Sequence, residues 1–128
     1  MKKLLWLDDI RDPKTGDWLL NYAPEYAYGD GEVIWVKKYH EFVDWIEENG
    51  LPDMICFDHD LSDIHINKST YKEKTGYDCA KWLVEYCMDK NLPTPKFNIQ
   101  SANPTGKMNI QSLLKNYQKF YDNNNSNN

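Results

Sequence analysis

The chain has 128 residues, of which 41% are hydrophobic and 14% aromatic, and its net charge at neutral pH is −5. This composition supports one folded domain and excludes disorder along most of the chain. The negative charge disfavours general binding to duplex nucleic acid, because such binding requires the neutralisation of many phosphates. No apolar run is long enough to span a membrane or to form a signal-peptide core. Together with three cysteines that form no CxxC pair, these features predict a cytoplasmic protein with reduced thiols.

Strands and helices are predicted to alternate along the chain. Apolar runs rich in β-branched and aromatic residues indicate strands, and apolar residues at i, i+3, i+4 and i+7 indicate helices. The expected strands are 3–7, 32–36, 52–58 and 95–102, and the expected helices are 17–22, 39–50, 76–91 and 109–121. Asp78 is a candidate N-cap for the helix at 76–91. We expect residues 1–121 to form one α/β domain and the Asn-rich tail, 122–128, to be disordered.

This alternation predicts a doubly wound parallel sheet with helices on both faces. In such sheets, ligands bind beyond the carboxyl ends of the strands. Three of the expected strands carry polar residues there: Asp8 and Asp9, then Asp58 to Asp60, then Gln100 to Asn103. We therefore expect these three segments to form one site.

The acids of this site suggest a metal ion. Asp8, Asp9 and Asp58 would repel one another in a half-buried cleft, so either one of them takes up a proton or a divalent cation binds. Their oxygens suit Mg²⁺, Mn²⁺ or Ca²⁺, and we take Mg²⁺ or Mn²⁺ as the expected cofactor. The alternative is that these acids cap the loops that follow the strands.

His59 lies between Asp58 and Asp60. If the strand continues, its side chain points away from both acids, whereas a loop would let all three converge. A histidine here could act as a general acid or base, or could hydrogen-bond a neighbouring loop.

The segment "SANPTGKMN", 101–109, has the composition of a phosphate-binding loop. It offers Ser101, Asn103, Gly106 for close backbone approach, and Lys107 near a helix N-terminus, where anions bind. A plain strand-to-helix turn is the alternative. Arg11 could clamp a phosphate or form an ion pair with Asp9 or Asp12.

The acid pair Asp8-Asp9, Asp58 and the Ser101-Ala102 pair resemble the receiver domains of response regulators. The blocks "LWLDDIRDP", "FDHDL", "TGYDCAKWL" and "SANPTGKMNI", spread over residues 4–110, more closely resemble cyclic-phosphate-processing receiver domains. The resemblance implies a trimmed receiver (flavodoxin-like) topology of about four strands in the order 2-1-3-4. It also implies a metal site at the acids, and binding or processing of cyclic phosphates of nucleotides or RNA ends.

The chain departs from these families at three places. No fifth strand with its lysine follows the last expected strand, and Lys107 is the nearby substitute. Gln100 stands where the cyclic-phosphate family usually has histidine. Ser62 stands where that family tends to have glycine, and the polar loop 62–75 could be a lid or a specificity element.

Three functions remain open. The first is a metal-assisted cyclic phosphodiesterase, with Asp58, His59 and Asp60 as catalytic residues and a ligand bound by Arg11, Gln100, Ser101, Asn103, Gly106 and Lys107. The second is a sensor or sponge for a cyclic nucleotide, such as a viral counter-defence protein, in which Trp6, Trp18, Tyr22 and Tyr71 could stack on bases. The third is a phospho-accepting receiver with Asp58 as acceptor. The expected partner is a small phosphorylated ligand, and the oligomeric state stays open, a homo-oligomer included.

Overall fold

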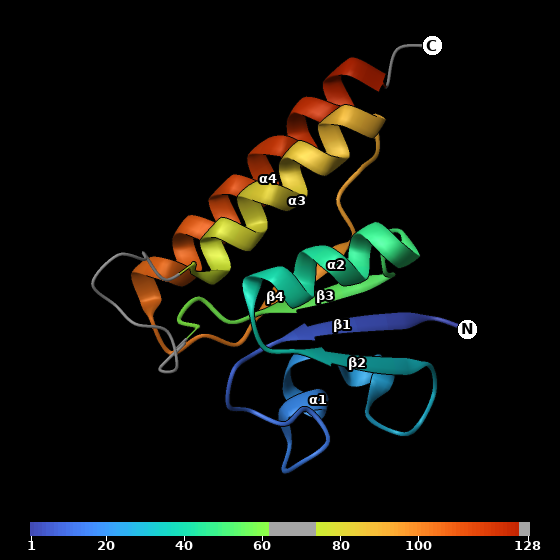
Figure 1. The fold of residues 1–128 in the computed structure, drawn as a ribbon, viewed down its shortest axis with the longest axis vertical. Coiled ribbons are helices and arrows are strands. Elements are labelled where there is room, and N and C mark those ends of the chain that lie inside the picture. Colours follow the sequence, from blue (N-terminus) through green and yellow to red (C-terminus); the bar gives the residue numbers. More distant parts are fainter. Residues whose placement is uncertain (62–73, 126–128) are drawn as a thin grey trace.

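The computed structural model describes residues 1–61 and 74–125 and shows a four-stranded parallel sheet (Figure 1). Its strands are β1 (Lys3–Leu7), β2 (Glu32–Val36), β3 (Met54–Phe57) and β4 (Lys96–Ile99). They lie in the order β2-β1-β3-β4, and each neighbouring pair is parallel. The predicted sheet and strand order are confirmed. The chain winds outward in opposite directions from β1 and β3, which places the ends of these two strands at the point where ligands bind in doubly wound sheets.

Helices cover both faces of the sheet. The elements are α1 (Trp18–Tyr22), the 3-10 helix η1 (Pro24–Tyr26), α2 (Tyr39–Asn49), α3 (Gly76–Lys90) and α4 (Pro104–Asn125). One face packs against α2, α3 and α4, through buried residues such as Phe42, Leu83 and Ile110. The other face packs against α1 and η1, where Trp6 and Leu19 are buried together. Both faces are covered, which agrees with the continuously apolar sequence of β3 and of β1 after Lys3.

The start of α3 differs from the prediction. Thr75, not Asp78, is the N-cap: its hydroxyl accepts a hydrogen bond from the Asp78 N–H, and the Asp78 carboxylate accepts one from the Thr75 N–H. This reciprocal arrangement is a capping box, in which the acid occupies the third helical position. Both residues favour helix starts, and their spacing of three decides which one caps.

Helix α4 is longer than predicted at both ends. It begins at Pro104 rather than at residue 109, because Asn103 caps it and proline is well suited to the first helical position. It continues to Asn125, so residues 122–125 are helical and the predicted boundary at 121 is wrong there. The last turns are held by side-chain contacts such as Gln118 to Asp122 at 2.9 Å. Residues 126–128 lie outside the described residues.

Two other expectations depend on positions the structure does not describe. Most of the polar loop predicted as a lid, including Ser62 and Tyr71, lies outside the described residues. No helix among residues 1–61 and 74–125 is long and apolar enough to cross a membrane.

The capping box of α3 can be tested directly. Thr75→Ala removes the acceptor of the Asp78 N–H, and we expect the free energy of unfolding to fall by about 1 kcal/mol, the usual cost of losing an N-cap. Thr75→Ser keeps the hydroxyl and should lose much less. Urea denaturation followed by circular dichroism measures both variants. Equal losses would show that the hydroxyl does not stabilise the helix.

Candidate functional site

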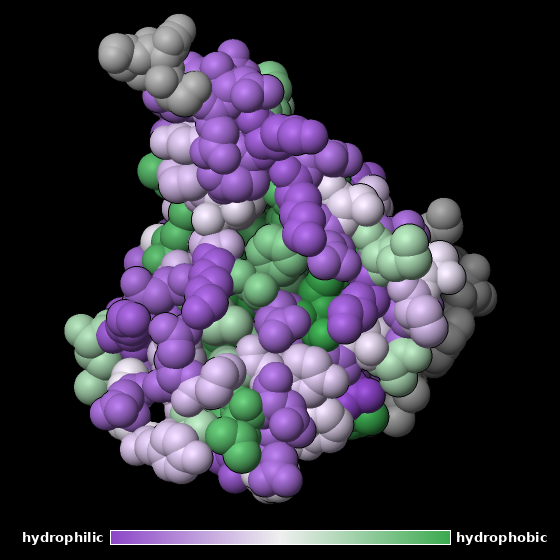
Figure 2. Space-filling model, turned by 180° about the vertical axis from the view of Figure 1, so that it is seen from behind, coloured by the Kyte–Doolittle hydropathy of each residue, from purple (hydrophilic) through white to green (hydrophobic). Residues whose placement is uncertain are grey.

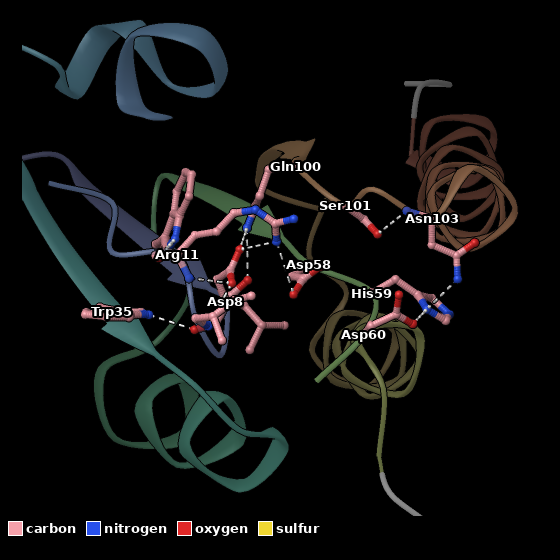
Figure 3. A network of polar contacts seen from close by, with 12 residues as sticks. Asp8, Arg11, Trp35, Asp58, His59, Asp60, Gln100, Ser101 and Asn103 are labelled. Atoms are coloured by element: carbon pink, nitrogen blue, oxygen red, sulfur yellow. Dashed lines mark hydrogen bonds and ion pairs between the residues drawn. The ribbon is translucent and has the colours of Figure 1, made fainter. Parts of the chain in front are cut away.

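The carboxyl ends of β1, β3 and β4 bring the predicted polar segments together (Figure 3). Asp8, Asp9 and Asp58 each place a carboxylate oxygen within 4.8 Å of the others. Asp8 is completely buried, and Asp58 is 3% exposed. The expected convergence of these three acids is therefore observed, and it lies at the edge of the sheet where the strand-end rule places a ligand.

Asp8 also has a structural role. One of its oxygens accepts hydrogen bonds from the backbone N–H groups of Ile10 and Arg11, at 3.0 and 2.9 Å. Its backbone carbonyl accepts a bond of 2.7 Å from the indole N–H of Trp35 on β2. The expectation that an acid after a strand caps the next loop is thus correct for Asp8, and it holds together with the expectation of a shared acidic site.

Arg11 lies between the two buried acids. Its guanidinium is 3.1 Å from Asp8 Oδ2 and 3.6 Å from Asp58 Oδ2, and its Cζ lies 5.2 Å from the centre of the Trp18 ring. Arg11 thus has Asp8 and Asp58 as ion-pair partners, which the sequence did not indicate, and Asp9 also acts electrostatically on the guanidinium. The loop after β1 turns back over the strand end, so that the guanidinium reaches β3. Arg11 thus supplies positive charge to Asp8 and Asp58, as a bound metal cation would.

The surroundings of Asp58 favour its protonated form. Burial, and then repulsion from Asp8, raise the pKa of Asp58 from 3.8 to about 7, although Arg11 acts to lower it. Arg11 thus offsets only part of the effect that burial and the neighbouring carboxylates have on the pKa of Asp58. An additional cation at these oxygens would lower the pKa of Asp58 again, because an opposite charge favours the ionised form.

Gln100 completes the buried side of the site. Its amide nitrogen donates to the Leu7 carbonyl at 3.0 Å and to Asp8 Oδ2 at 3.4 Å. Its amide oxygen is buried and has no hydrogen-bond partner among residues 1–61 and 74–125. Buried polar atoms usually have a partner, so this oxygen is a vacant acceptor beside the carboxylates. The atoms that could bind a metal ion here, the carboxylate oxygens and the Gln100 amide oxygen, are all oxygens. Such a ligand set suits Mg²⁺ or Mn²⁺.

His59 and Asp60 form a second part of the site, next to α4. His59 Nδ1 lies 2.8 Å from Asp60 Oδ1 and 3.5 Å from the Asn103 side-chain nitrogen. A carboxylate only accepts hydrogen bonds when ionised, so the short contact with Asp60 favours the tautomer with a proton on Nδ1, whereas the Asn103 amide nitrogen is itself a donor. His59 is turned toward α4, whereas Asp58 is turned toward Arg11, and strand alternation predicted these opposite directions (Figure 3). Alternation also predicted that Asp60 would point to the same side as Asp58, but its carboxylate contacts His59 instead.

Two glycines let the chain pack closely around these residues. A Cβ on Gly106 would lie 2.4 Å from His59 Cγ, and a Cβ on Gly76 would lie 1.8 Å from the Asp58 carbonyl oxygen. Gly106 is therefore needed for the histidine ring, a packing reason separate from its predicted contact with a ligand. Gly76 was not identified from the sequence, although it belongs to the "TGYDCAKWL" block.

Polar groups of the predicted phosphate loop, 101–109, already form hydrogen bonds with the backbone at the start of α4. The Asn103 side-chain oxygen accepts the N–H of Gly106 at 3.0 Å, and Ser101 Oγ accepts the N–H of Asn103 at 3.0 Å. Pro104 has no N–H. The start of α4 therefore offers an anion fewer backbone donors than expected, and the remaining cationic group of this loop is the exposed Lys107.

The aromatic residues proposed for base stacking divide into two kinds. Trp6 is completely buried, and its indole N–H donates to the Arg11 carbonyl at 2.9 Å, so it supports the site from within. Trp18 and Tyr22 stack on each other with ring centres 6.1 Å apart. A hollow of about 780 Å³ lies beside α1 and β2, but none of the predicted site residues lines it.

A sequence profile described as "Cyclic-phosphate processing Receiver domain" matches residues 3–116. The chain belongs to this family. Among solved structures, it is similar to NtrX from Brucella abortus, with 12% sequence identity and a TM-score of 0.46. That match covers 99% of this chain and 30% of the NtrX chain. Comparison with curated proteins gives no significant match.

The pKa of Asp58 predicts how the stability of the metal-free protein depends on pH. Its folded value of about 7 lies above the ordinary 3.8, so the folded state binds the extra proton between these values. The stability that this proton confers is complete below the unfolded pKa and is lost as pH rises through about 7, with a slope of at most about 1.4 kcal/mol per pH unit.

Chemical denaturation in EDTA from about pH 4 to about pH 8 measures this slope. Asp58→Asn should flatten it, whereas Asp60→Asn, which removes only the smallest of the charges that raise the pKa of Asp58, should change it little. An unchanged slope in Asp58→Asn would assign the titration to another group.

Proposed function

We propose that this domain binds a cyclic phosphodiester of a nucleotide or an RNA end and hydrolyses it with the help of a divalent cation. The observation that carries the proposal is the juxtaposition of two parts of one site. A cluster of three carboxylates, in which burial and repulsion from Asp8 raise the pKa of Asp58 to about 7, lies next in sequence to a histidine whose Nδ1 is 2.8 Å from Asp60 Oδ1. Membership of the cyclic-phosphate-processing family supports the same substrate class.

Asp8, Asp9 and Asp58 would hold the cation, which when bound polarises a phosphate and makes a water molecule more acidic. Arg11 has a planar fork of donors that matches phosphate oxygens as well as carboxylate oxygens. It can therefore exchange its present partners, Asp8 and Asp58, for the phosphate of a ligand. Ser101 follows the end of β4, and Lys107 lies in α4 and lines the same groove as Ile99; they would add one donor and one charge.

His59 is suited to move the proton. With Nδ1–H donated to Asp60, Nε2 can accept a proton from the water that attacks phosphorus and pass it to the ribose oxygen that leaves. One P–O bond forms and another breaks, so the product is a phosphomonoester, or an opened diester in a larger ring. Asp60 keeps the ring in the required tautomer and stabilises its protonated form.

Capture of the same ligand without cleavage is the second candidate. Gln100 supports it: this residue stands where the family usually has histidine, and its amide nitrogen is committed to Leu7 and Asp8. An amide cannot exchange protons as imidazole does. If the histidine of the relatives supplies the proton transfer, this chain retains binding and loses turnover, as a sensor or sponge would.

Phosphorylation of Asp58 is less well supported. The pKa of about 7 leaves this carboxyl partly protonated at neutral pH, and no fifth strand follows β4 among the residues the structure describes. Incubation with acetyl phosphate and Mg²⁺ would label Asp58 if the receiver reaction occurs, and a labelled aspartate would favour that function over the other two.

The metal part of the proposal predicts a ligand-dependent stability. At about pH 8, where Asp58 is ionised, saturating Mg²⁺ or Mn²⁺ should raise the melting temperature of the wild type, because a ligand that binds the folded state stabilises it. Asp58→Asn and Asp9→Asn should lose most of this increase. Asp60→Asn is the matched control and should keep it. Equal increases in all four proteins would place the cation elsewhere.

The catalytic part predicts a separable role for His59. His59→Asn should lower the rate of cyclic phosphodiester opening by about 10²- to 10⁴-fold, the usual contribution of a general base, while the dissociation constant changes little. Chromatography of 2′,3′-cyclic and 3′,5′-cyclic nucleotides incubated with protein and Mg²⁺ or Mn²⁺ measures the rate, and calorimetry measures binding. Recovery of bound ligand intact from the wild type would establish capture, and absence of both binding and cleavage would refute the proposal.

A further inference from the structure

A groove of about 420 Å³ runs between the edge strand β4 and helix α4. Its volume falls in the usual range of small-molecule sites, about 300–1,000 Å³. Phe97 and Ile99 of the strand and Lys107, Gln111 and Lys115 of the helix line it. Figure 2, the view from behind, shows hydrophobic surface in a hollow on this side of the molecule, with hydrophilic side chains projecting around it. The groove lies where a fifth strand would extend the sheet.

The charge of this groove is opposite to that of the protein. Among the described residues, its lining contains three lysines and no acidic residue, in a chain with 20 acidic and 15 basic residues. Lys96 is paired with Glu25 at 2.7 Å. Lys107 and Lys115 form no ion pair among the described residues, and they lie eight residues apart on α4, about 12 Å along the helix axis. Two lysines so far apart suit a ligand with more than one anionic group.

A peptide strand is a poor occupant of this groove. Extension of the sheet would need free backbone donors along the edge of β4. The Ile99 N–H is already donated to the Asn98 side-chain oxygen at 2.8 Å, and just before the strand the Thr94 N–H is donated to Gln118 Oε1 of α4 at 2.9 Å. The side chains that line the groove therefore determine what it binds.

The groove begins beside the carboxylate site. Ile99, at its floor, directly precedes Gln100, which contacts Asp8. Lys107, on its wall, directly follows Gly106, which contacts the His59 ring. A ligand bound at the strand ends would thus have an anionic extension directed along the lysines of α4.

We infer that the ligand of this domain is an oligonucleotide rather than a mononucleotide, and that the groove holds the nucleotide next to the cyclic phosphate. This inference rests on the proposed function. The partly buried Phe97 offers an aromatic surface for a base, and Lys107 and Lys115 pair with phosphates. The same chemistry is found in an RNA end that carries a 2′,3′-cyclic phosphate and in a cyclic dinucleotide.

Three probes test the inference in the presence of Mg²⁺: adenosine 2′,3′-cyclic monophosphate, the ApA dinucleotide ending in a 2′,3′-cyclic phosphate, and cyclic di-AMP. The dissociation constant is measured by calorimetry, or KM where the probe is cleaved. We expect at least one dinucleotide to bind about tenfold more tightly than the mononucleotide, the gain typical of one stacked base. Whichever dinucleotide shows the gain identifies the source, a linear RNA end or a closed ring.

Variants on α4 and β4 separate the groove from general charge effects. Lys115→Glu should remove the dinucleotide gain, leave mononucleotide binding unchanged and reduce the salt slope by about 0.7 per lost phosphate contact. Lys119→Glu makes the same charge change at an exposed position outside the groove and should affect neither probe. Phe97→Leu keeps an apolar side chain but removes the ring, and should weaken only the dinucleotide.

Equal binding of mononucleotide and dinucleotides by the wild type would overturn the inference and leave the proposed function standing. So would equal losses in Lys115→Glu and Lys119→Glu, or displacement of the dinucleotide by an unphosphorylated acidic peptide of equal charge. Failure of all three probes to bind would remove the proposed function, and the inference with it.

Discussion

The arrangement of the strand ends depends on the guanidinium of Arg11. Two buried carboxylates, Asp8 and Asp58, lie side by side at the ends of the two central strands, and such a pair is unfavourable without a countercharge. Arg11 supplies it from the loop after β1, while Asp8 holds the backbone of that loop. The same contacts therefore organise the loop and neutralise the site. A domain built in this way can stay folded before any ligand arrives, with a side chain that can later turn to a phosphate.

Much of the architecture could be predicted from patterns among residues that are close together in the sequence. The four strands could be located because each is an apolar run bounded by polar residues, and their order followed from the resemblance to receiver domains. Helix boundaries were harder to predict. The segment around Asn103 and Pro104 is typical both of a turn and of a helix N-terminus, and local sequence does not choose between them. The apolar face of α4 that follows this segment packs in the core against the sheet, and this packing favours the helix over the turn.

The site was predictable in position but less so in its contacts. Asp8, Asp9 and Asp58 could be grouped because parallel strands end at a common edge. The partners of Arg11 could not be predicted, because they depend on how its loop folds back over β3. Nor could the contact of Gly106 with the His59 ring, since it depends on the distance between α4 and the loop after β3. Contacts between elements distant in sequence set these details.

The blocked edge of β4 also bears on strand pairing between chains. An open edge strand is a template for pairing with other chains, and a sheet that ends after four strands exposes such an edge next to its core. Here the strand spans four residues, and Asn98 and Gln118 already bind two backbone N–H groups in and next to it. The shortened fold thus keeps its surface groove without presenting a long edge on which polymers could grow. Loss of these two side chains would create a risk of aggregation before any loss of the fold.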